Sequence, residues 1–424
     1  MIVLRSILYE CFECGALSPA LGHKTSCDEC GGILQYHYPN LRPRKLSDLT
    51  ESALPGIWLF QKLLPVLKPA SNMIYLGEGR TSLYEDKAIA RLVGREDVDF
   101  LVKDESTNPT GTIKDRSASV ALSVYKERNI QNITLSSTGN TATSYGLYNQ
   151  KAYKKLAIFI PTDQENVVNF DDETERTHII LVNGRYVDAT SLSIKMAEES
   201  PYILDGGFAN PNQIAGLETM AYEVYFQLYE RYGKQARTLM NSGKVWYLHP
   251  TGSGNGLLAW YQAVDRLKEY GFLREYIHLI CAQPEGCASI VDPAQINQER
   301  VTQRITSTTW AKTIENEYPK HCYPYVKYVV KETQGIFHKV SEKKSRELYE
   351  ASDNLFETQI MPPTAIAIQA AVELADQFDS GDVVIIGYTG VERERKHYRF
   401  QRIGPVSKDI TINQLLEENP QLLY

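Results

Sequence analysis

Short apolar runs alternate with longer amphipathic stretches from about residue 98 to residue 388. The apolar runs are bounded by glycine, proline or polar residues, and they predict strands at 99–105, 133–138, 155–161, 244–250, 277–283 and 382–388. Stretches with helical periodicity between them predict helices at 115–129, 139–152, 256–271 and 363–378. This alternation is typical of an α/β fold with twisted, mostly parallel sheets covered by helices.

The chain before residue 98 has a different character. Residues 39–56, PNLRPRKLSDLTESALPG, are rich in proline and charge and predict a linker. The apolar stretch 57–68, IWLFQKLLPVLK, predicts a short helix that ends at its prolines. The start, MIVLRSILYECFECG, does not read as a signal peptide, and no apolar run has the length of a membrane span.

Four of the seven cysteines form two Cys-x-x-Cys pairs, CFEC and CDEC, near the start. Thiolates at this spacing can close a tetrahedral shell around Zn²⁺. Two disulfides or a redox pair are alternatives, and His23 could replace a ligand. We expect a structural zinc ribbon, because so small a unit cannot bury an apolar core and its metal supplies the folding free energy. The expected metal ligands are Cys11, Cys14, Cys27 and Cys30.

Composition narrows the class of protein. The net charge of −7 disfavours binding to nucleic acid or to an anionic membrane, both of which attract a basic face. Hydrophobic residues make up 43% of the chain and charged residues 23%, as in soluble globular proteins. Cys281, Cys287 and Cys322 are scattered, as reduced core thiols are, and a cytoplasmic location is expected.

Three loops rich in glycine and hydroxyl groups each follow a predicted strand: SSTGNT at 136–141, TGSGNG at 251–256 and GYTG at 387–390. The carboxyl ends of strands are where ligands bind in open α/β sheets. Glycines in the second loop let backbone N–H groups surround a phosphate. Each loop alone is equally consistent with strand–helix packing.

The stretch NPTGTIKDR, 108–116, places Lys114 directly after a tight turn. A lysine amine can form a Schiff base, a glycine loop can take a phosphate, and an amide or hydroxyl can contact an aromatic ring. Taken together, the lysine and the three loops predict a covalently held, phosphate-bearing aromatic cofactor.

The motifs NPTGTIKDR, SSTGNTA, NP…GLETMAYEV and HPTGSGNG occur in this chain in the order seen in threonine synthases, and GIWLFQKLLP and LGEGRTSL also resemble that family. The resemblance runs from Cys11 to Thr389. It implies a two-domain, fold-type-II (tryptophan-synthase-β-like) enzyme that uses pyridoxal 5′-phosphate. The implied division is a zinc ribbon at 1–45, a large cofactor-binding domain at 46–118 and 220–424, and a small domain at 119–219 that closes over the substrate.

The resemblance also implies roles for individual residues. Lys114 is the implied catalytic residue, which forms the Schiff base and later moves the α-proton. Asn140 is implied at the ring hydroxyl and Thr389 at the pyridine nitrogen. The implied phosphate loop is Thr251, Gly252, Ser253, Gly254 and Asn255, and the implied contacts to the substrate are Ser137, Thr138 and Thr141.

The substrate segment departs from the family's pattern. Threonine synthases commonly read NSxNPxRxEGQKT where this chain reads GGFANPNQIAGLETM. Gly207 stands in the position of the first Asn of that pattern, Gln213 in the position of the Arg and Glu218 in the position of the Lys. A dianionic phosphate favours a guanidinium fork, which glutamine cannot supply. We therefore expect Gln213 to belong to a substrate site altered for a different activated amino acid.

The expected reaction is elimination or replacement on an O-activated amino acid, with β-replacement on O-phosphoserine or O-acetylserine favoured. The alternatives are threonine synthesis from O-phosphohomoserine, dehydration to a keto acid, and a non-catalytic ligand sensor or assembly protein. Loss of Lys114 or Asn140 would favour the non-catalytic alternative, and both are present. The expected partner is a small-molecule amino-acid substrate. The resemblance also implies that the chain can form a homodimer.

Overall fold

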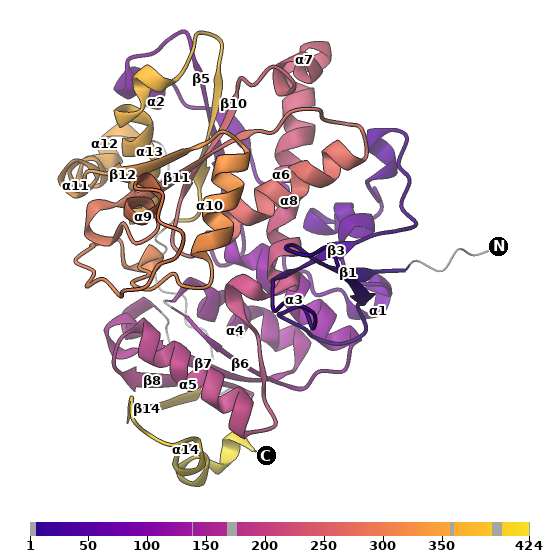
Figure 1. Ribbon diagram of the computed structural model, residues 1–424, viewed down its shortest axis with the longest axis vertical. Coiled ribbons are helices and arrows are strands. Elements are labelled where there is room, and N and C mark those ends of the chain that lie inside the picture. The colour runs from indigo at the N-terminus through magenta and orange to yellow at the C-terminus, as the bar shows by residue number, and fades with distance from the viewer. Residues whose placement is uncertain (1–5, 138, 168–175, 357–359, 392–400, 424) are drawn as a thin grey trace.

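The computed structural model describes residues 6–137, 139–167, 176–356, 360–391 and 401–423. Two large sheets and one small N-terminal sheet organise this part of the chain (Figure 1). Helices cover both large sheets, one in the upper half of Figure 1 and the other in the lower half. The predicted α/β fold with mostly parallel sheets is therefore confirmed.

The larger sheet has six strands in the order β12-β11-β10-β13-β5-β4. Only the edge pair of β4 with β5 is antiparallel within this sheet. Alternate residues enter two cores: Val383 and Ile385 pack with α6, α8 and α10, whereas Val384 and Ile386 pack with α13. The strands are β4 (Leu83–Glu85), β5 (Asp99–Asp104), β10 (Val245–Pro250), β11 (His278–Pro284), β12 (Ile336–Val340) and β13 (Val383–Tyr388). The helices are α6 (Pro211–Tyr232), α8 (Asn255–Glu269), α10 (Tyr323–Glu332) and α13 (Pro362–Glu373).

The second sheet has five parallel strands in the order β14-β8-β7-β6-β9. Helices α3 and α4 pack on one face, and α5 and α14 pack on the other. The strands are β6 (Asn132–Ser136), β7 (Lys155–Pro161), β8 (Thr177–Asn183), β9 (Ile203–Leu204) and β14 (Gln401–Ser407). The helices are α3 (Lys114–Glu127), α4 (Asn140–Ala152), α5 (Tyr186–Glu199) and α14 (Ile412–Glu418).

Strand β14 corrects two expectations. The predicted strand at 382–388 is not the last one, and residues 401–407 join the smaller sheet rather than the large domain expected at 220–424. The sequence of β14, QRIGPVS, is interrupted by Gly404 and Pro405, and the register shifts between Ile403 and Val406. Proline is tolerated at a sheet edge, where β14 lies, but it hides the strand pattern in the sequence.

The N-terminal sheet has the order β2-β1-β3 and packs against the helical body. The Tyr36 hydroxyl donates to Asn212 Oδ1 over 2.6 Å, and Arg266 Nη2 donates to the Tyr36 carbonyl over 2.9 Å. The strand bounds are Leu8–Cys11, Leu17–Pro19 and Leu34–His37 for β1, β2 and β3. The remaining helices are α1 (Pro69–Asn72), α2 (Lys87–Val93), α7 (Ala236–Met240), α9 (Val291–Gln295), α11 (Glu342–Glu350) and α12 (Ser352–Leu355).

The helix predicted at 57–68 is shorter and tighter than expected. A 3-10 helix covers Gly56–Leu63, and Leu64 is already extended. Leu64 precedes Pro65, whose ring disfavours helical backbone in the residue before it. Across the described ranges, we find no helix with the length and apolarity that crossing a membrane requires.

Candidate active site

A network of hydrogen bonds shapes the turn before Lys114. The Asn108 amide donates to Glu105 Oε2 over 2.7 Å and accepts from the Gly79 N–H over 3.0 Å. Thr110 donates through its N–H and its hydroxyl to the two carboxylate oxygens of Asp115, over 2.6 and 2.7 Å. These bonds fix the direction in which α3 starts, and therefore the position of its first residue, Lys114.

The loop after β13 is tied to the same turn by backbone contacts. Thr112 and Gly390 form an antiparallel bridge, and the Ile113 N–H donates to the Thr389 carbonyl over 3.0 Å. A Cβ at Gly390 would lie 2.7 Å from the Gly111 carbonyl oxygen, so the close approach requires glycine. Thr389 is thereby held beside the start of α3.

The side chain of Lys114 is half-buried. Among the described residues, none accepts a hydrogen bond from its Nζ and no carboxylate forms an ion pair with it. Burial lowers the pKa of the Lys114 amine to about 8. A larger fraction of the amine is therefore unprotonated near neutral pH than in an exposed lysine, which makes it a better nucleophile.

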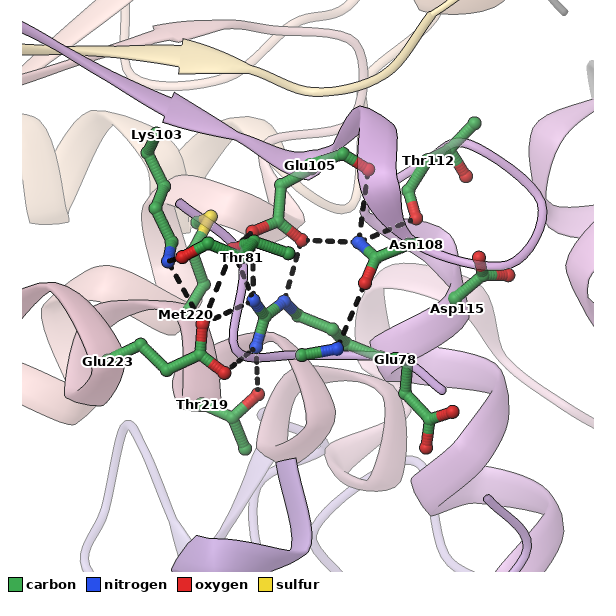
Figure 2. A network of polar contacts seen from close by, with 12 residues as sticks. Glu78, Thr81, Lys103, Glu105, Asn108, Thr112, Asp115, Thr219, Met220 and Glu223 are labelled. Atoms are coloured by element: carbon green, nitrogen blue, oxygen red, sulfur yellow. Dashed lines mark hydrogen bonds and ion pairs between the residues drawn. The ribbon is translucent and has the colours of Figure 1, made fainter. Parts of the chain in front are cut away.

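Arg116, two residues further along α3, is buried and pairs with Glu105 and Glu223. Figure 2 shows these two carboxylates close to Lys103. The Arg116 guanidinium donates to Glu105 over 2.7 Å and to Glu223 over 2.7 Å, and Lys103 Nζ lies 2.9 Å from Glu223. Burial would raise the pKa of Glu223, but the charges of Arg116 and Lys103 hold that pKa well below its usual range. Two cations and two carboxylates thus balance behind the lysine turn.

A cavity of about 120 Å³ opens in front of Lys114, at the carboxyl ends of strands from both large sheets. It brings together the three glycine- and hydroxyl-rich loops that the sequence analysis singled out. Nine of the predicted site residues line it: Lys114, Ser137, Asn140, Thr141, Gly252, Ser253, Gly254, Asn255 and Thr389. Thr251 is buried behind the loop, where its hydroxyl donates to the His249 carbonyl over 2.9 Å. Thr138 lies outside the described residues.

Neighbouring segments pack closely against the glycine loop after β10 and leave little space for side chains at Gly252 and Gly254. Gly254 has a φ of +86°, and a Cβ there would lie 2.2 Å from Val326 Cγ2. A Cβ at Gly252 would lie 3.2 Å from the Ile314 Cα. Asn255 then starts α8, whose first backbone N–H groups point towards the loop. Backbone donors at a helix N-terminus, approached closely through glycine, suit a phosphate.

The start of α4 forms another part of the cavity wall. The Ser137 hydroxyl accepts from the N–H groups of Gly139 and Ala142, each over 3.0 Å, so this oxygen caps the helix. Asn140 and Thr141 are the first two residues of α4, and both line the cavity. An amide and a hydroxyl therefore face the space in front of Lys114.

Several lining residues were missed by the sequence analysis. His249 is buried, and burial followed by the charge of Lys114 lowers its pKa to about 3, so its ring is neutral. The Tyr247 hydroxyl lies 3.0 Å from His249 Nδ1. His249 stands two residues before the glycine loop in HPTGSGNG, which was the only sequence signal. Further lining residues, among them Tyr186, Pro363 and residues 313–316, come from segments without a local motif.

Gln213 does not line this cavity. Its side chain is buried and donates to Asp205 Oδ2 over 2.5 Å. Asp205 also accepts from the hydroxyls of Tyr125 and Tyr145, each over 2.8 Å. Glu218, which replaces the family's lysine, pairs with Arg266 of α8 and accepts from the Tyr222 hydroxyl. Gln213 and Glu218, the two altered polar residues of the substrate segment, thus bind neighbouring side chains outside this cavity.

The four N-terminal cysteines converge. Their sulfur atoms lie within 4.8 Å of one another, with Sγ–Sγ distances of 3.4 Å for Cys11 and Cys30 and 3.8 Å for Cys14 and Cys27. All four are free thiols, since a disulfide would bring the sulfurs to about 2.05 Å. Sulfurs about 2.3 Å from a central zinc stand about 3.8 Å apart in a tetrahedron. The geometry and chemistry of this donor set therefore fit zinc.

Comparison with known proteins agrees with this geometry. Residues 74–390 match the family model described as "Pyridoxal-phosphate dependent enzyme". The threonine synthase of Methanocaldococcus jannaschii is 26% identical over 290 residues, which cover 68% of this chain and 67% of that protein. The cysteate synthase of Methanococcoides burtonii is 22% identical over 431 residues, covering 94% of this chain and 97% of that protein.

Among solved structures, threonine synthase from Escherichia coli superposes with a TM-score of 0.65 at 13% sequence identity, covering 93% of this chain and 95% of that one. At this identity the superposition concerns the fold, and it agrees with the expected fold type II. The resemblance to threonine synthases and their relatives, first noted from the motifs, is confirmed. The chain belongs to the family of pyridoxal-phosphate dependent enzymes.

Proposed function

We propose that this enzyme carries out elimination or replacement on an O-activated amino acid, and that its substrate is a serine derivative undergoing β-replacement. The observation that carries the proposal is the missing guanidinium: no arginine among the described residues lines the cavity, and neither does Gln213. Gln213 stands where threonine synthases commonly have an arginine, it has no positive charge, and its amide is bound to Asp205. A site that grips the phosphate of phosphohomoserine favours a guanidinium fork. The similarity to a cysteate synthase over nearly the whole chain supports the same choice.

The lining of the cavity fits pyridoxal 5′-phosphate. Gly252, Ser253, Gly254 and Asn255 would hold the phosphate, because the glycines allow close approach to the N–H groups at the start of α8. Asn140 and Thr389, which both line the cavity, would contact the aromatic ring. The bound cofactor withdraws electrons from the α-carbon of an amino acid, which allows a β-substituent to leave.

Lys114 has two tasks in this proposal. Its amine, with a pKa lowered to about 8 by burial, is the group that binds the cofactor covalently. With the cofactor and substrate bound, Lys114 Nζ would take the proton from the substrate α-carbon. Its half-buried position at the cavity wall lets the amine reach the substrate while limiting its hydration.

Thr389 bears on the type of reaction. Its side chain is a neutral hydroxyl rather than a carboxylate, so it would not stabilise a proton on the ring nitrogen of the cofactor. A weaker electron sink favours elimination and replacement over transamination. Ser137 and Thr141 would bind the carboxylate or leaving group of the substrate, since both stand on the wall formed by the start of α4.

A second candidate is threonine synthesis from O-phosphohomoserine. Several relatives with this name align over two thirds or more of the chain. The two candidates differ only in the substrate, because the cofactor and Lys114 serve both.

A visible-absorbance titration of the purified holoenzyme separates the candidates. The protein is mixed in turn with O-phosphoserine, O-acetylserine, serine, threonine and O-phosphohomoserine. The proposal expects new absorbance bands with a serine derivative and an unchanged spectrum with O-phosphohomoserine. Bands with O-phosphohomoserine alone would make the enzyme a threonine synthase. A protein that stays colourless after cofactor addition would contradict both candidates.

We also propose that Cys11, Cys14, Cys27 and Cys30 hold one structural Zn²⁺. Chelation under denaturing conditions should release about one zinc per chain, measured by elemental analysis. The variant Cys14→Ser should lose the metal, whereas Cys287→Ser, at a buried lone thiol, should keep it. Disulfide-linked peptides from residues 11–30 in the native protein would contradict this assignment.

A further inference from the structure

A second cavity, of about 300 Å³, lies between the N-terminal ribbon and α8. The ribbon contributes Glu10 and residues 35–38, and α8 contributes side chains from its C-terminal half, beginning at Gln262. The active-site cavity lies at the other end of α8, so the two sites are separate and can be occupied at the same time.

The wall of this cavity carries both signs of charge. Glu10 is half-buried, and its nearest polar contacts are the Gln35 amide at 3.2 Å and His37 at 3.8 Å. Lys268 lies over the Tyr276 ring with its Nζ 3.2 Å from the centroid, and no carboxylate among the described residues pairs with it. A carboxylate without a close ion pair and a lysine whose ammonium rests on an aromatic ring therefore both line this partly open cavity.

Gln262 gives an independent sign of a missing ligand. Its side chain is 3% exposed, yet its Nε2 has no acceptor among the residues that the structure describes. Buried polar groups nearly always have a hydrogen-bond partner in folded proteins. Gln262 lines this cavity, so a molecule bound there can supply the acceptor.

The chemistry of the wall excludes simpler occupants. In the described ranges, the cysteine cluster is the only group of metal-ligating side chains that converges, so Glu10, Asp265 and Glu269 do not form a cation site. An inorganic anion would meet these same carboxylates. A molecule with a carboxylate for Gln262 and Lys268 and an ammonium for Glu10 satisfies both signs at once.

We propose that the cavity between the ribbon and α8 binds a small zwitterion of the α-amino-acid class. The carboxylate of the ligand accepts from Gln262 and Lys268, and its ammonium donates to Glu10. The buried Arg266 holds the wall in place, because it is bound to Glu218, to the Tyr222 hydroxyl and to the backbone of Tyr36. The proposal concerns a site separate from the reaction, and it stands whichever amino acid is the substrate.

The test is isothermal titration calorimetry on holoenzyme whose cofactor has been fixed to Lys114 with borohydride, which prevents exchange with an added amino acid. The probes are L-serine, L-threonine, L-methionine, L-aspartate and L-lysine, each titrated to about 10 mM, which covers millimolar affinities. We expect at least one of them to bind with a stoichiometry of one per chain.

Two variants locate the binding. Lys268→Glu and Gln262→Leu should each weaken the affinity by about tenfold or more. Lys320→Glu makes the same charge change at an exposed lysine outside this cavity and should leave the affinity unchanged. Lys268 is half-exposed, so its variant should fold normally. Absence of binding by all five probes, or an affinity that Lys268→Glu does not alter, would overturn the proposal.

Discussion

Lys114 and Arg116 stand two residues apart in the first turn of α3, yet the protein treats their positive charges in opposite ways. Arg116 is fully buried and bonded to two carboxylates, Glu105 and Glu223. Lys114 faces the active-site cavity and has no counter-ion among the described residues. Because successive helical residues are about 100° apart, these two side chains leave the helix on nearly opposite sides.

This difference shows how one helix turn can combine stability with reactivity. The network around Arg116 anchors α3 to β5 and α6 without using the cavity, since Glu105 directly follows β5 and Glu223 belongs to α6. Lys114 can then remain unpaired, and burial alone lowers its pKa to about 8. A counter-ion beside Lys114 would favour its charged form and make the amine less nucleophilic.

The largest expected effect follows from removing the unpaired charge. Lys114→Ala should abolish borohydride-fixable cofactor and reduce turnover by about a thousandfold or more. Its free energy of unfolding should stay within about 1 kcal/mol of the wild type, because no ion pair is lost. Spectra after borohydride treatment, together with urea titrations, check both statements. Lys234→Ala, at an exposed lysine, is the control, and cofactor fixed covalently in Lys114→Ala would refute the assignment.

Removing the paired charge should act on folding. Arg116→Met leaves Glu105 and Glu223 without their shared cation and should lower the free energy of unfolding by about 3–5 kcal/mol. Arg231→Met breaks the pair with Glu85, in which the two side chains are 33% and 41% exposed, and should cost at most about 1 kcal/mol. Urea denaturation measures both. Equal losses in the two variants would show that the buried network does not anchor α3.

The smallest effect concerns pH. The lowered pKa of about 8 means that the Lys114 amine is mostly protonated below pH 8 and mostly free above it. The rate of cofactor uptake by the apo-protein should therefore rise about tenfold per pH unit up to pH 8 and then level off. A lysine-containing peptide reacting with the same cofactor is the control, with a midpoint near 10.4. A midpoint for the protein close to that of the peptide would contradict the effect of burial.

The sequence predicted the elements that have strong local patterns. The buried strands β5, β7, β10, β11 and β13 are apolar runs, and each lies within one residue of its predicted bounds. The pattern failed where pairing partners, rather than apolarity, define the element. Strand β14 is interrupted by Gly404 and Pro405 and is held at the sheet edge by β8. Nothing local to residues 401–407 reveals that partner.

The candidate site shows the same division. Lys114, Asn140, the glycine loop and Thr389 were found because each follows a predicted strand or a recognisable turn, and all of them line one cavity. His249 was missed because its place in the cavity wall depends on close packing against Gly256, where a Cβ would lie 2.4 Å from the imidazole ring. The position of Gln213 also depended on the fold, since its partner Asp205 is eight residues away and buried.

The bridge between Thr112 and Gly390 has an evolutionary consequence. The main chain, and not a side chain, sets the spacing between Lys114 and residue 389, because the Ile113 N–H binds the Thr389 carbonyl. Residue 389 can therefore be exchanged without moving the lysine. In the binding mode that we propose, a single substitution at residue 389 would therefore change the group beside the cofactor ring and leave the scaffold as it is.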